Sequence, residues 1–522
     1  MVLAVVVVLA SPSAWAWNRS CAWASGTIPV YVLADTTTNF GFTFEQMFWL
    51  VEQMGRPWNT TGGVNVRLAY PTYVSGTTPG TSGGINYRMF GSRPGTLAVM
   101  NGNCVTSYVD FYNKIYLSAS RPLTSGSDNI ISIGVHETGH ALGFLHPLDS
   151  PGTCGKGGDT SASAVTVMTQ SDGWGHAHNI WLDDWQGLRS GTCPYTASTP
   201  SGATRVYSTT NTTTWTHVVS WGTGTNLTPG IAWGAPSGGT GFTVQASVNF
   251  NNSLSVWKYQ SGWVSGYTSP DNAMAGPVVA YGNGRFIVAY PKQTSGSEGF
   301  LRVMHSTDGV NWTSYFPSIR TAHRVGLAYS TNTNRWYLSY VRLRDNVGGF
   351  NNPNGRVQIV SSSDGINWSS ESDFGEEYAV DGIGLTCDGS YCYTLYSSAR
   401  TGVGTLRESV FYFDGSGNPL LDHSYSFPLW NGMQTTSRYD VSAAYDASRG
   451  QIVYVSKNYN AIRAMWRLAG SSDPPPGFVG WPETPGFPSG STVAGSNNTT
   501  EGGAVTFVGG GANEVWLMAH LP

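Results

Sequence analysis

The clearest indication of a chemical function in this sequence is one short stretch that contains three histidines, one glutamate and one glycine. His136 and His140 are four residues apart, so on a helix their side chains lie on one face and one metal ion can accept both. Glu137 lies beside them, where it can take a proton from a metal-bound water. Gly143 favours a helix end, after which His146 can return as a third ligand. The spacing predicts a catalytic zinc site with an open fourth position.

The string H-E-x-x-H-x-x-G-x-x-H resembles the signature of the metzincin metalloproteases, which is followed by a Met-turn. Met168, in Thr-Val-Met-Thr-Gln, is a candidate for that methionine, which in the family lies beneath the three imidazoles. The resemblance covers residues 17–194 and implies a secreted zinc endopeptidase with one catalytic Zn²⁺, Glu137 as general base and a protein or peptide substrate. Calcium is common in the family, although no loop here has convincing ligand spacing.

The metzincin subfamily stays open. Asp183-Asp184-Trp185-Gln186-Gly187-Leu188 resembles a matrixin pattern, whereas Pro147, directly after the third histidine, resembles serralysins.

Alternating and helical apolar patterns predict the elements that would position this site. Strands are expected at Ile28–Ala34, Val64–Ala69, Ile85–Phe90, Thr96–Asn101 and Lys114–Ser118, with helices at Phe42–Met54 and from about Asp128. This order is what the resemblance implies for an α+β catalytic domain.

Composition and the N-terminus indicate an extracellular protein. Only 11% of residues are charged and the net charge is −4, which argues against nucleic acid as a partner. Residues 2–10 are apolar and Ala14-Trp15-Ala16 fits a cleavage site, so residues 1–16 are predicted to be a signal peptide. No later run is long and apolar enough to span a membrane.

The six cysteines fit an oxidising compartment. Cys387 and Cys392 flank a turn sequence and are expected to close one hairpin. Cys21, Cys104, Cys154 and Cys193 allow three pairings, of which we favour Cys21–Cys104 with Cys154–Cys193.

Beyond a linker at 195–203, residues 204–522 repeat a unit of two apolar strands joined by a turn, which predicts a β-propeller of six blades. Arg205–Ser208 and Trp215–Val219 are expected to complete the last blade and close the ring. Two repeats contain Ser306-Thr307-Asp308-Gly309-Val310-Asn311-Trp312 and Ser363-Asp364-Gly365-Ile366-Asn367-Trp368. These resemble the structural Asp-box of sialidase-type propellers.

The sequence therefore predicts a multidomain chain, an α+β metzincin-like domain followed by an all-β propeller that binds a substrate, a glycan or a surface. The alternative is a propeller glycosidase, sialidase-like, or a carbohydrate-binding adhesin, with the first domain as an accessory metal domain. A sialidase needs a cluster of arginines and a Tyr–Glu pair, and Arg205, Arg285, Arg302 and Arg356 show no telling spacing.

Overall fold

The computed structural model describes the strands and the helix named below with many of their connecting turns. Residues 1–17, 34–49, 113–129, 146–153, 156–202, 343–355, 427–438 and 471–502, with shorter stretches between elements, lie outside the described part.

The N-terminal unit is built on a five-stranded sheet with the order β5-β3-β6-β8-β7. Its strands are β3 (Val30–Leu33), β5 (Thr72–Val74), β6 (Gly84–Met89), β7 (Ala98–Gly102) and β8 (Thr106–Phe111). All neighbours are parallel except β7, which is an antiparallel edge strand beside β8. Two further small sheets pair β2 (Gly26–Ile28) with β4 (Val66–Leu68), and β1 (Asn18–Arg19) with β9 (Phe144–Leu145) and β10 (Cys154–Gly155).

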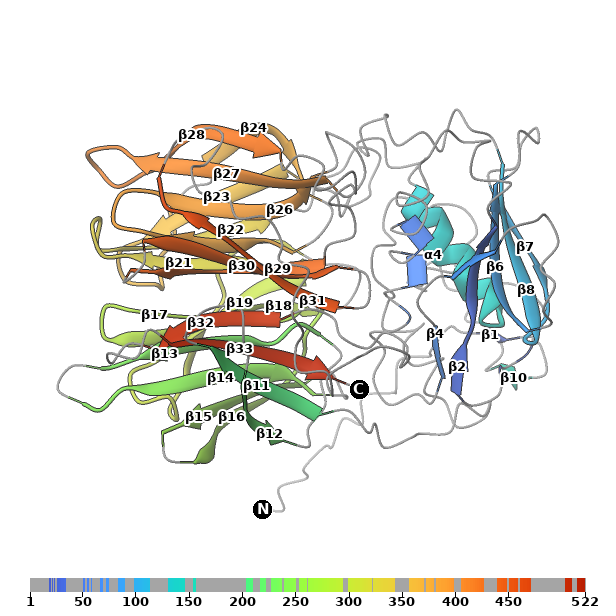
Figure 1. Ribbon diagram of the computed structural model, residues 1–522, viewed down its shortest axis with the longest axis horizontal. Coiled ribbons are helices and arrows are strands. Elements are labelled where there is room, and N and C mark those ends of the chain that lie inside the picture. Colours follow the sequence, from blue (N-terminus) through green and yellow to red (C-terminus); the bar gives the residue numbers. More distant parts are fainter. Residues whose placement is uncertain are drawn as a thin grey trace, which may run out of the picture.

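Helix α4 (Ile130–Ala141) packs on this sheet, on the side that faces the propeller in Figure 1. Ile133 and Val135 are buried, and the Tyr87 hydroxyl of β6 lies 2.7 Å from the Thr138 hydroxyl of the helix. Outside the sheet, α4 also approaches Met54 closely at Gly134, where a Cβ would lie 2.2 Å from the Met54 side chain and would displace it. The helix is therefore fixed to the sheet by apolar contacts and a buried hydrogen bond.

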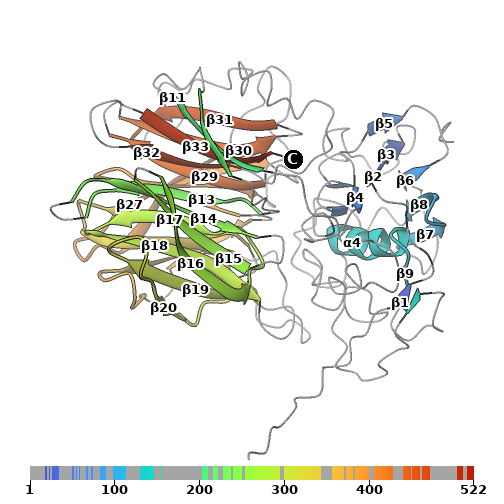
Figure 2. The same cartoon turned by 90° about the horizontal axis from the view of Figure 1, so that it is seen from below.

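The second unit is a β-propeller whose successive sheets surround one axis (Figures 1 and 2). Four of its sheets have four consecutive strands each. These are β13 (Gly230–Gly234), β14 (Phe242–Val248), β15 (Ser253–Tyr259) and β16 (Trp263–Asn272); β17 (Val278–Gly282), β18 (Arg285–Gln293), β19 (Gly299–Ser306) and β20 (Thr313–Tyr315); β21 (Gly326–Ser330), β22 (Arg335–Val341), β23 (Arg356–Ser362) and β24 (Ser372–Tyr378); and β25 (Gly384–Cys387), β26 (Cys392–Ser398), β27 (Thr405–Phe413) and β28 (Pro419–Ser426).

A three-stranded sheet follows, β29 (Tyr439–Asp446), β30 (Gln451–Asn458) and β31 (Ala461–Leu468). The ring is closed by strands from both ends of the propeller sequence, in the order β12-β11-β33-β32. Here β11 (Ala203–Thr209) pairs with β12 (Thr216–Trp221) and with β33 (Glu514–Leu521), which also pairs with β32 (Gly503–Val508). The expectation that residues 205–219 supply the missing outer strands is confirmed.

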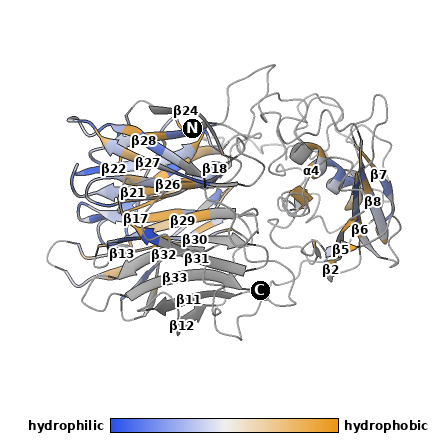
Figure 3. Ribbon diagram, turned by 45° about the horizontal axis from the view of Figure 1, so that its top comes forward, coloured by the Kyte–Doolittle hydropathy of each residue, from blue (hydrophilic) through white to orange (hydrophobic). Residues whose placement is uncertain are grey.

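Apolar residues fill the spaces between the sheets, and much of β29 is coloured as hydrophobic in Figure 3. Arg324 is buried, and its guanidinium donates to three carbonyl oxygens, those of Pro229 at 3.4 Å directly before β13, Pro277 at 3.3 Å directly before β17, and Val441 at 2.8 Å in β29. One side chain thus connects the starts of several inner strands.

The fold class expected from the sequence needs a correction. The described residues are nearly all β, and α4 is the one helix with both ends in the described part, so the prediction of an α+β metzincin catalytic domain was wrong. A helix with a metal-binding pattern is a local feature and does not determine the fold around it. Most of the helix expected at 42–54, and the strand expected at 114–118, lie outside the described residues. The domain limits at 16 and 194 remain predictions.

Both disulfides whose cysteines are described agree with the expected pairs. Cys21 is bonded to Cys104 and Cys387 to Cys392. Cys193 lies outside the described residues, so the partner of Cys154 remains a prediction.

Candidate functional site

Helix α4 brings two of the predicted metal ligands together. The rings of His136 and His140 have centroids 4.7 Å apart and are nearly perpendicular. His140 Nδ1 lies 2.7 Å from the Phe144 carbonyl oxygen, and this contact orients the ring so that Nε2 is the nitrogen that would bind a metal. The two imidazoles therefore fit the donor set of a zinc ion.

Glu137, which follows His136 on α4, is buried. Burial raises the pKa of its carboxyl to about 7, a backbone hydrogen bond at Met100 opposes the rise, and the negative charge of Asp110 adds to it. Asp110 is itself held by Arg88, whose Nε and Nη2 each lie 2.6 Å from a carboxylate oxygen. Near neutral pH the Glu137 carboxyl can therefore exchange a proton.

Gly143 ends the α4 segment as the sequence predicts. Its φ is +95°, and a Cβ would lie 2.2 Å from the Cys21 carbonyl oxygen and 3.0 Å from Cys104 Sγ. The turn after α4 thus packs against the Cys21–Cys104 disulfide, and glycine is required for both conformation and space. His146 and Met168 lie outside the described residues.

A second cluster lies on the propeller, between the sheet β13–β16 and the sheet β17–β20. Phe316, directly after β20, has 60% of its surface exposed. Lys292 Nζ and Arg302 Cζ lie 5.6 Å and 4.9 Å from the centre of its ring. Asp271 reaches over from β16 and forms salt bridges with both cations, at 2.7 Å from Lys292 Nζ to Asp271 Oδ1 and with Arg302 Nη1 at Oδ2.

Neighbouring hydroxyls fix this arrangement. Arg302 Nη2 lies 3.0 Å from the Ser314 hydroxyl, and the Tyr290 hydroxyl lies 3.4 Å from Asp271 Oδ2. Tyr290 pairs directly with Arg302 across strands β18 and β19. Burial raises the pKa of Tyr290, so its hydroxyl stays a neutral donor. We call Asp271, Tyr290, Lys292, Arg302 and Phe316 the Phe316 cluster.

Sequence reasoning named only Arg302 of this cluster. Asp271 belongs to a different sheet from the other members, and no spacing in the chain indicates that two neighbouring sheets bring them together. Arg285, which the sequence analysis set beside Arg302, donates instead to the Asp364 carbonyl oxygen at 3.1 Å. The side chains of Arg205 and Arg356 lie outside the described residues.

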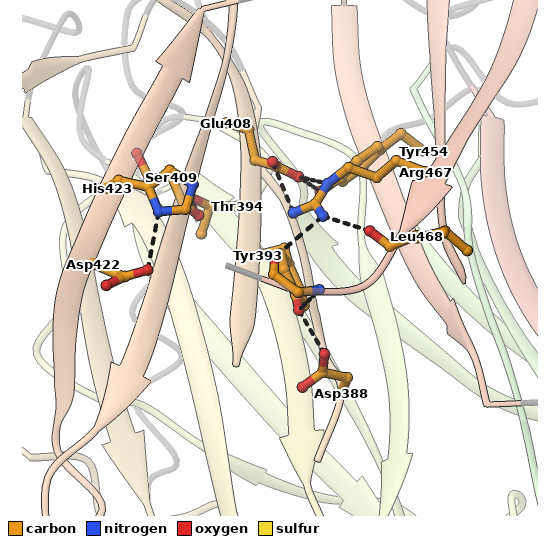
Figure 4. Close-up of polar contacts among 11 residues, drawn as sticks. Asp388, Tyr393, Thr394, Glu408, Ser409, Asp422, His423, Tyr454, Arg467 and Leu468 are labelled. Carbon is orange, nitrogen blue, oxygen red and sulfur yellow. Dashed lines mark hydrogen bonds and ion pairs between the residues drawn. The ribbon is translucent and has the colours of Figure 1, made fainter. Parts of the chain in front are cut away.

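A buried Tyr–Glu–Arg network connects the sheet β25–β28 with the sheet β29–β31 (Figure 4). Arg467 Nη2 lies 2.9 Å from Glu408 Oε2, and the Tyr454 hydroxyl donates to Glu408 Oε1. The Arg467 guanidinium also lies over the Tyr393 ring, 4.6 Å from its centre. The Arg467 and Glu408 side chains are each only 1% exposed, so this network connects two sheets and offers no surface to a ligand.

The two Asp-boxes are structural turns. Asp308 Oδ1 accepts hydrogen bonds from the backbone N–H groups of Val310 and Asn311, both at 2.8 Å, and Asp364 repeats this with Ile366 and Asn367. Burial acts to raise the pKa of Asp308, but these hydrogen bonds outweigh it and hold that pKa well below its ordinary value. The carboxylates are fully engaged within their own turns.

A third turn of related chemistry was missed in the sequence. Asp414 Oδ1 accepts from the backbone N–H groups of Ser416 and Asn418, both at 2.8 Å. Its motif, Asp414-Gly415-Ser416-Gly417-Asn418, has no tryptophan at the position where the Asp-boxes have one.

Comparisons with known proteins give likenesses of fold only. No protein-family model and no curated protein matches this chain. Among solved structures, it is similar to a lectin from the fungus Aleuria aurantia, with TM-score 0.37, 13% identity, and coverage of 50% of this chain and 83% of the lectin. It is also similar to the NanB sialidase of Streptococcus pneumoniae, with TM-score 0.31, 14% identity, and coverage of 40% of this chain and 32% of the sialidase. A GH32 beta-fructofuranosidase from Bombyx mori gives TM-score 0.31 and 14% identity over 46% of this chain and 60% of the enzyme.

The chain thus spans about a third of the sialidase and somewhat over half of the fructofuranosidase. The propeller is established here by its own strand order.

The metzincin resemblance and the zinc endopeptidase activity inferred from it are corrected accordingly. Within the described residues, which include neither His146 nor Met168, no group of three His, Cys, Asp or Glu side chains could hold a metal ion. The described part of the chain is nearly all β. In the described part, no helix is both long and apolar enough to cross a membrane.

Proposed function

We propose that this protein binds a carbohydrate through the Phe316 cluster of its propeller. The observation that carries the proposal is an aromatic ring with 60% of its surface exposed, set beside three charged side chains held by salt bridges. Single exposed apolar side chains are common on protein surfaces, so the support for a ligand here is the combination of the exposed ring with charged side chains held in place by salt bridges.

The chemistry of the cluster suits a sugar. One face of a pyranose carries C–H groups that can lie on an aromatic ring, while its edge presents hydroxyls that need donors and acceptors. Phe316 supplies the apolar face. Lys292 and Arg302, both close to the ring, supply donors, and Asp271, which is bound to both of them, supplies an acceptor.

Binding to an array of oligosaccharides, followed by titration calorimetry with the best ligand, tests the proposal. Phe316→Ala should weaken binding roughly tenfold, because an aromatic contact contributes about 0.5–1.5 kcal/mol beyond the area it buries. Tyr412→Ala is the matched control, since Tyr412 is 42% exposed on β27 in another sheet, and it should bind as the wild type does.

Equal binding by wild type and Phe316→Ala would show that the sugar does not lie on this ring. Failure to bind any oligosaccharide would reject the proposal altogether.

A glycosidase activity is less well supported by the described residues. Hydrolysis of a glycosidic bond needs two carboxyl groups on either side of the bond. Asp271 is engaged by two cations, and Glu408 is buried in the Tyr–Glu–Arg network. We therefore propose binding without hydrolysis.

Separately, we propose that His136 and His140 hold a zinc ion together with His146. The facing rings on α4 and the orienting contact of His140 with the Phe144 carbonyl support this. Bound zinc supplies positive charge and Lewis acidity to whatever lies beside it. Glu137, the buried residue after His136, would be the general base that the motif predicts, and a calcium ion remains a further expectation.

Metal analysis by plasma mass spectrometry tests the zinc proposal. The wild type should contain about one zinc per chain, and His136→Ala and His140→Ala should each lose most of it. His305→Ala, in the propeller, should keep it. A zinc-free wild type, or His140→Ala with full zinc content, would reject the site.

A further inference from the structure

We propose that the sugar bound at the Phe316 cluster carries an anionic group, a carboxylate or a sulfate ester, and that Lys292 selects it. This rests on the proposed function of the cluster. It goes further because it names the chemical class of the ligand and the residue that distinguishes it.

The charges around Phe316 are unequal. Lys292 and Arg302 are both beside its ring, and a third cation, Arg320, lies over the ring of Phe300, 5.4 Å from its centre. Phe300 pairs directly with Lys292 and bridges to Arg320, so the three cations come from adjoining backbone positions. Asp271 is the carboxylate that the described contacts place among them.

One carboxylate cannot balance both Lys292 and Arg302. The two oxygens of Asp271 are divided between these two cations, so this trio retains a net positive charge. A ligand anion that approaches the ring meets this surplus at short range, where charges are less screened than in bulk water.

Lys292 is the cation best placed to meet the ligand. Its side chain is 28% exposed, compared with 13% for Arg302, whose guanidinium is held by Asp271 and Ser314. An ammonium has three donor hydrogens, and the salt bridge of Lys292 with Asp271 within the described residues uses one of them. The remaining donors can therefore turn toward an anionic substituent of a sugar resting on Phe316.

The experiment compares oligosaccharides of one length and backbone that are neutral, carboxylated or sulfated. Each is titrated into the full-length wild type, Lys292→Met and Phe316→Ala at low and at physiological salt. Methionine keeps the apolar stem and removes the charge. Lys258→Met is the matched control, because Lys258 also lies over an aromatic ring, 4.0 Å from the centre of Phe242, but apart from the cluster.

The wild type should bind one or both anionic sugars roughly tenfold more tightly than the neutral one at low salt, with a smaller ratio at physiological salt. Lys292→Met should lose the preference, bind the neutral sugar somewhat more weakly than the wild type because one donor is gone, and give the circular dichroism spectrum of the wild type, which shows that it is folded. Lys258→Met should keep the preference. Which anionic sugar is preferred identifies the carboxylate or the sulfate as the ligand group.

Equal binding of neutral and anionic sugars by the wild type, or an unchanged preference in Lys292→Met, would overturn the inference and leave carbohydrate binding standing. The absence of binding in every arm, or unchanged binding by Phe316→Ala, would instead reject the proposed function itself.

Discussion

An arginine lies over an aromatic ring at two places in the propeller, Arg467 over Tyr393 and Arg302 over Phe316, and the two contacts have different roles. Arg467 lies over Tyr393 with its side chain 1% exposed and Glu408 as its partner, so it serves to hold sheets together. Arg302 lies over Phe316, whose ring is 60% exposed, so the same kind of contact leaves a surface for a ligand. Exposure of the ring, more than the pairing of charges, separates a binding cluster from a structural one.

The contribution of the buried ion pair between Glu408 and Arg467 to stability can be tested by substitution. Glu408→Gln should lower the free energy of unfolding by about 3 kcal/mol, because Arg467 would keep its buried charge without a carboxylate. The double variant Glu408→Gln, Arg467→Met removes that charge and should recover part of the loss. Urea unfolding measures both. A double variant no more stable than Glu408→Gln would contradict the account.

The residues that could be predicted from the sequence were those close together in the chain. His136 and His140 lie on one face of α4, and Gly143 has the positive φ expected of it. Asp271 could not be assigned to Arg302, since the contact crosses from one sheet to the next. Short-range spacing is visible in a sequence, whereas contacts between sheets depend on how the sheets pack.

At the scale of elements, the propeller strands were the most predictable part. The paired apolar runs correspond to inner and second strands such as β17 and β18, because alternation and a tight turn are both local signals. The N-terminal sheet was less complete. The expected strands at 85–90 and 96–101 match β6 and β7, but β5 and β8 were missed. The run Thr106–Phe111 is polar at several positions, although Ser107 and Asp110 are buried.

Closure of the ring depends on β11, which pairs with β12 on one side and β33 on the other. Val206→Pro should lower the free energy of unfolding by about 3 kcal/mol, because proline has no N–H for the ladder of a central strand. Val206→Thr keeps the β-branched shape and should have a small effect. Urea unfolding of both variants provides the measurement. Equal stability of the two would mean that pairing at β11 contributes little.

At the scale of the whole molecule, the sequence led to a wrong function because one helical motif was taken to represent an entire domain. The motif does lie on a helix, yet the described chain is nearly all β and the aromatic and charged side chains of its propeller offer a different kind of site. Function has to be argued from the assembled site, which for the Phe316 cluster exists only after two sheets have packed together.

The central claim is that the propeller binds sugar at Phe316, and a crystal structure of the full-length protein with its best-binding oligosaccharide tests it most directly. The account predicts a sugar ring lying on the face of Phe316, with substituents in hydrogen-bonding distance of Lys292 and Asp271. A sugar bound elsewhere on the propeller or on the N-terminal unit, with the Phe316 ring uncovered, would contradict it.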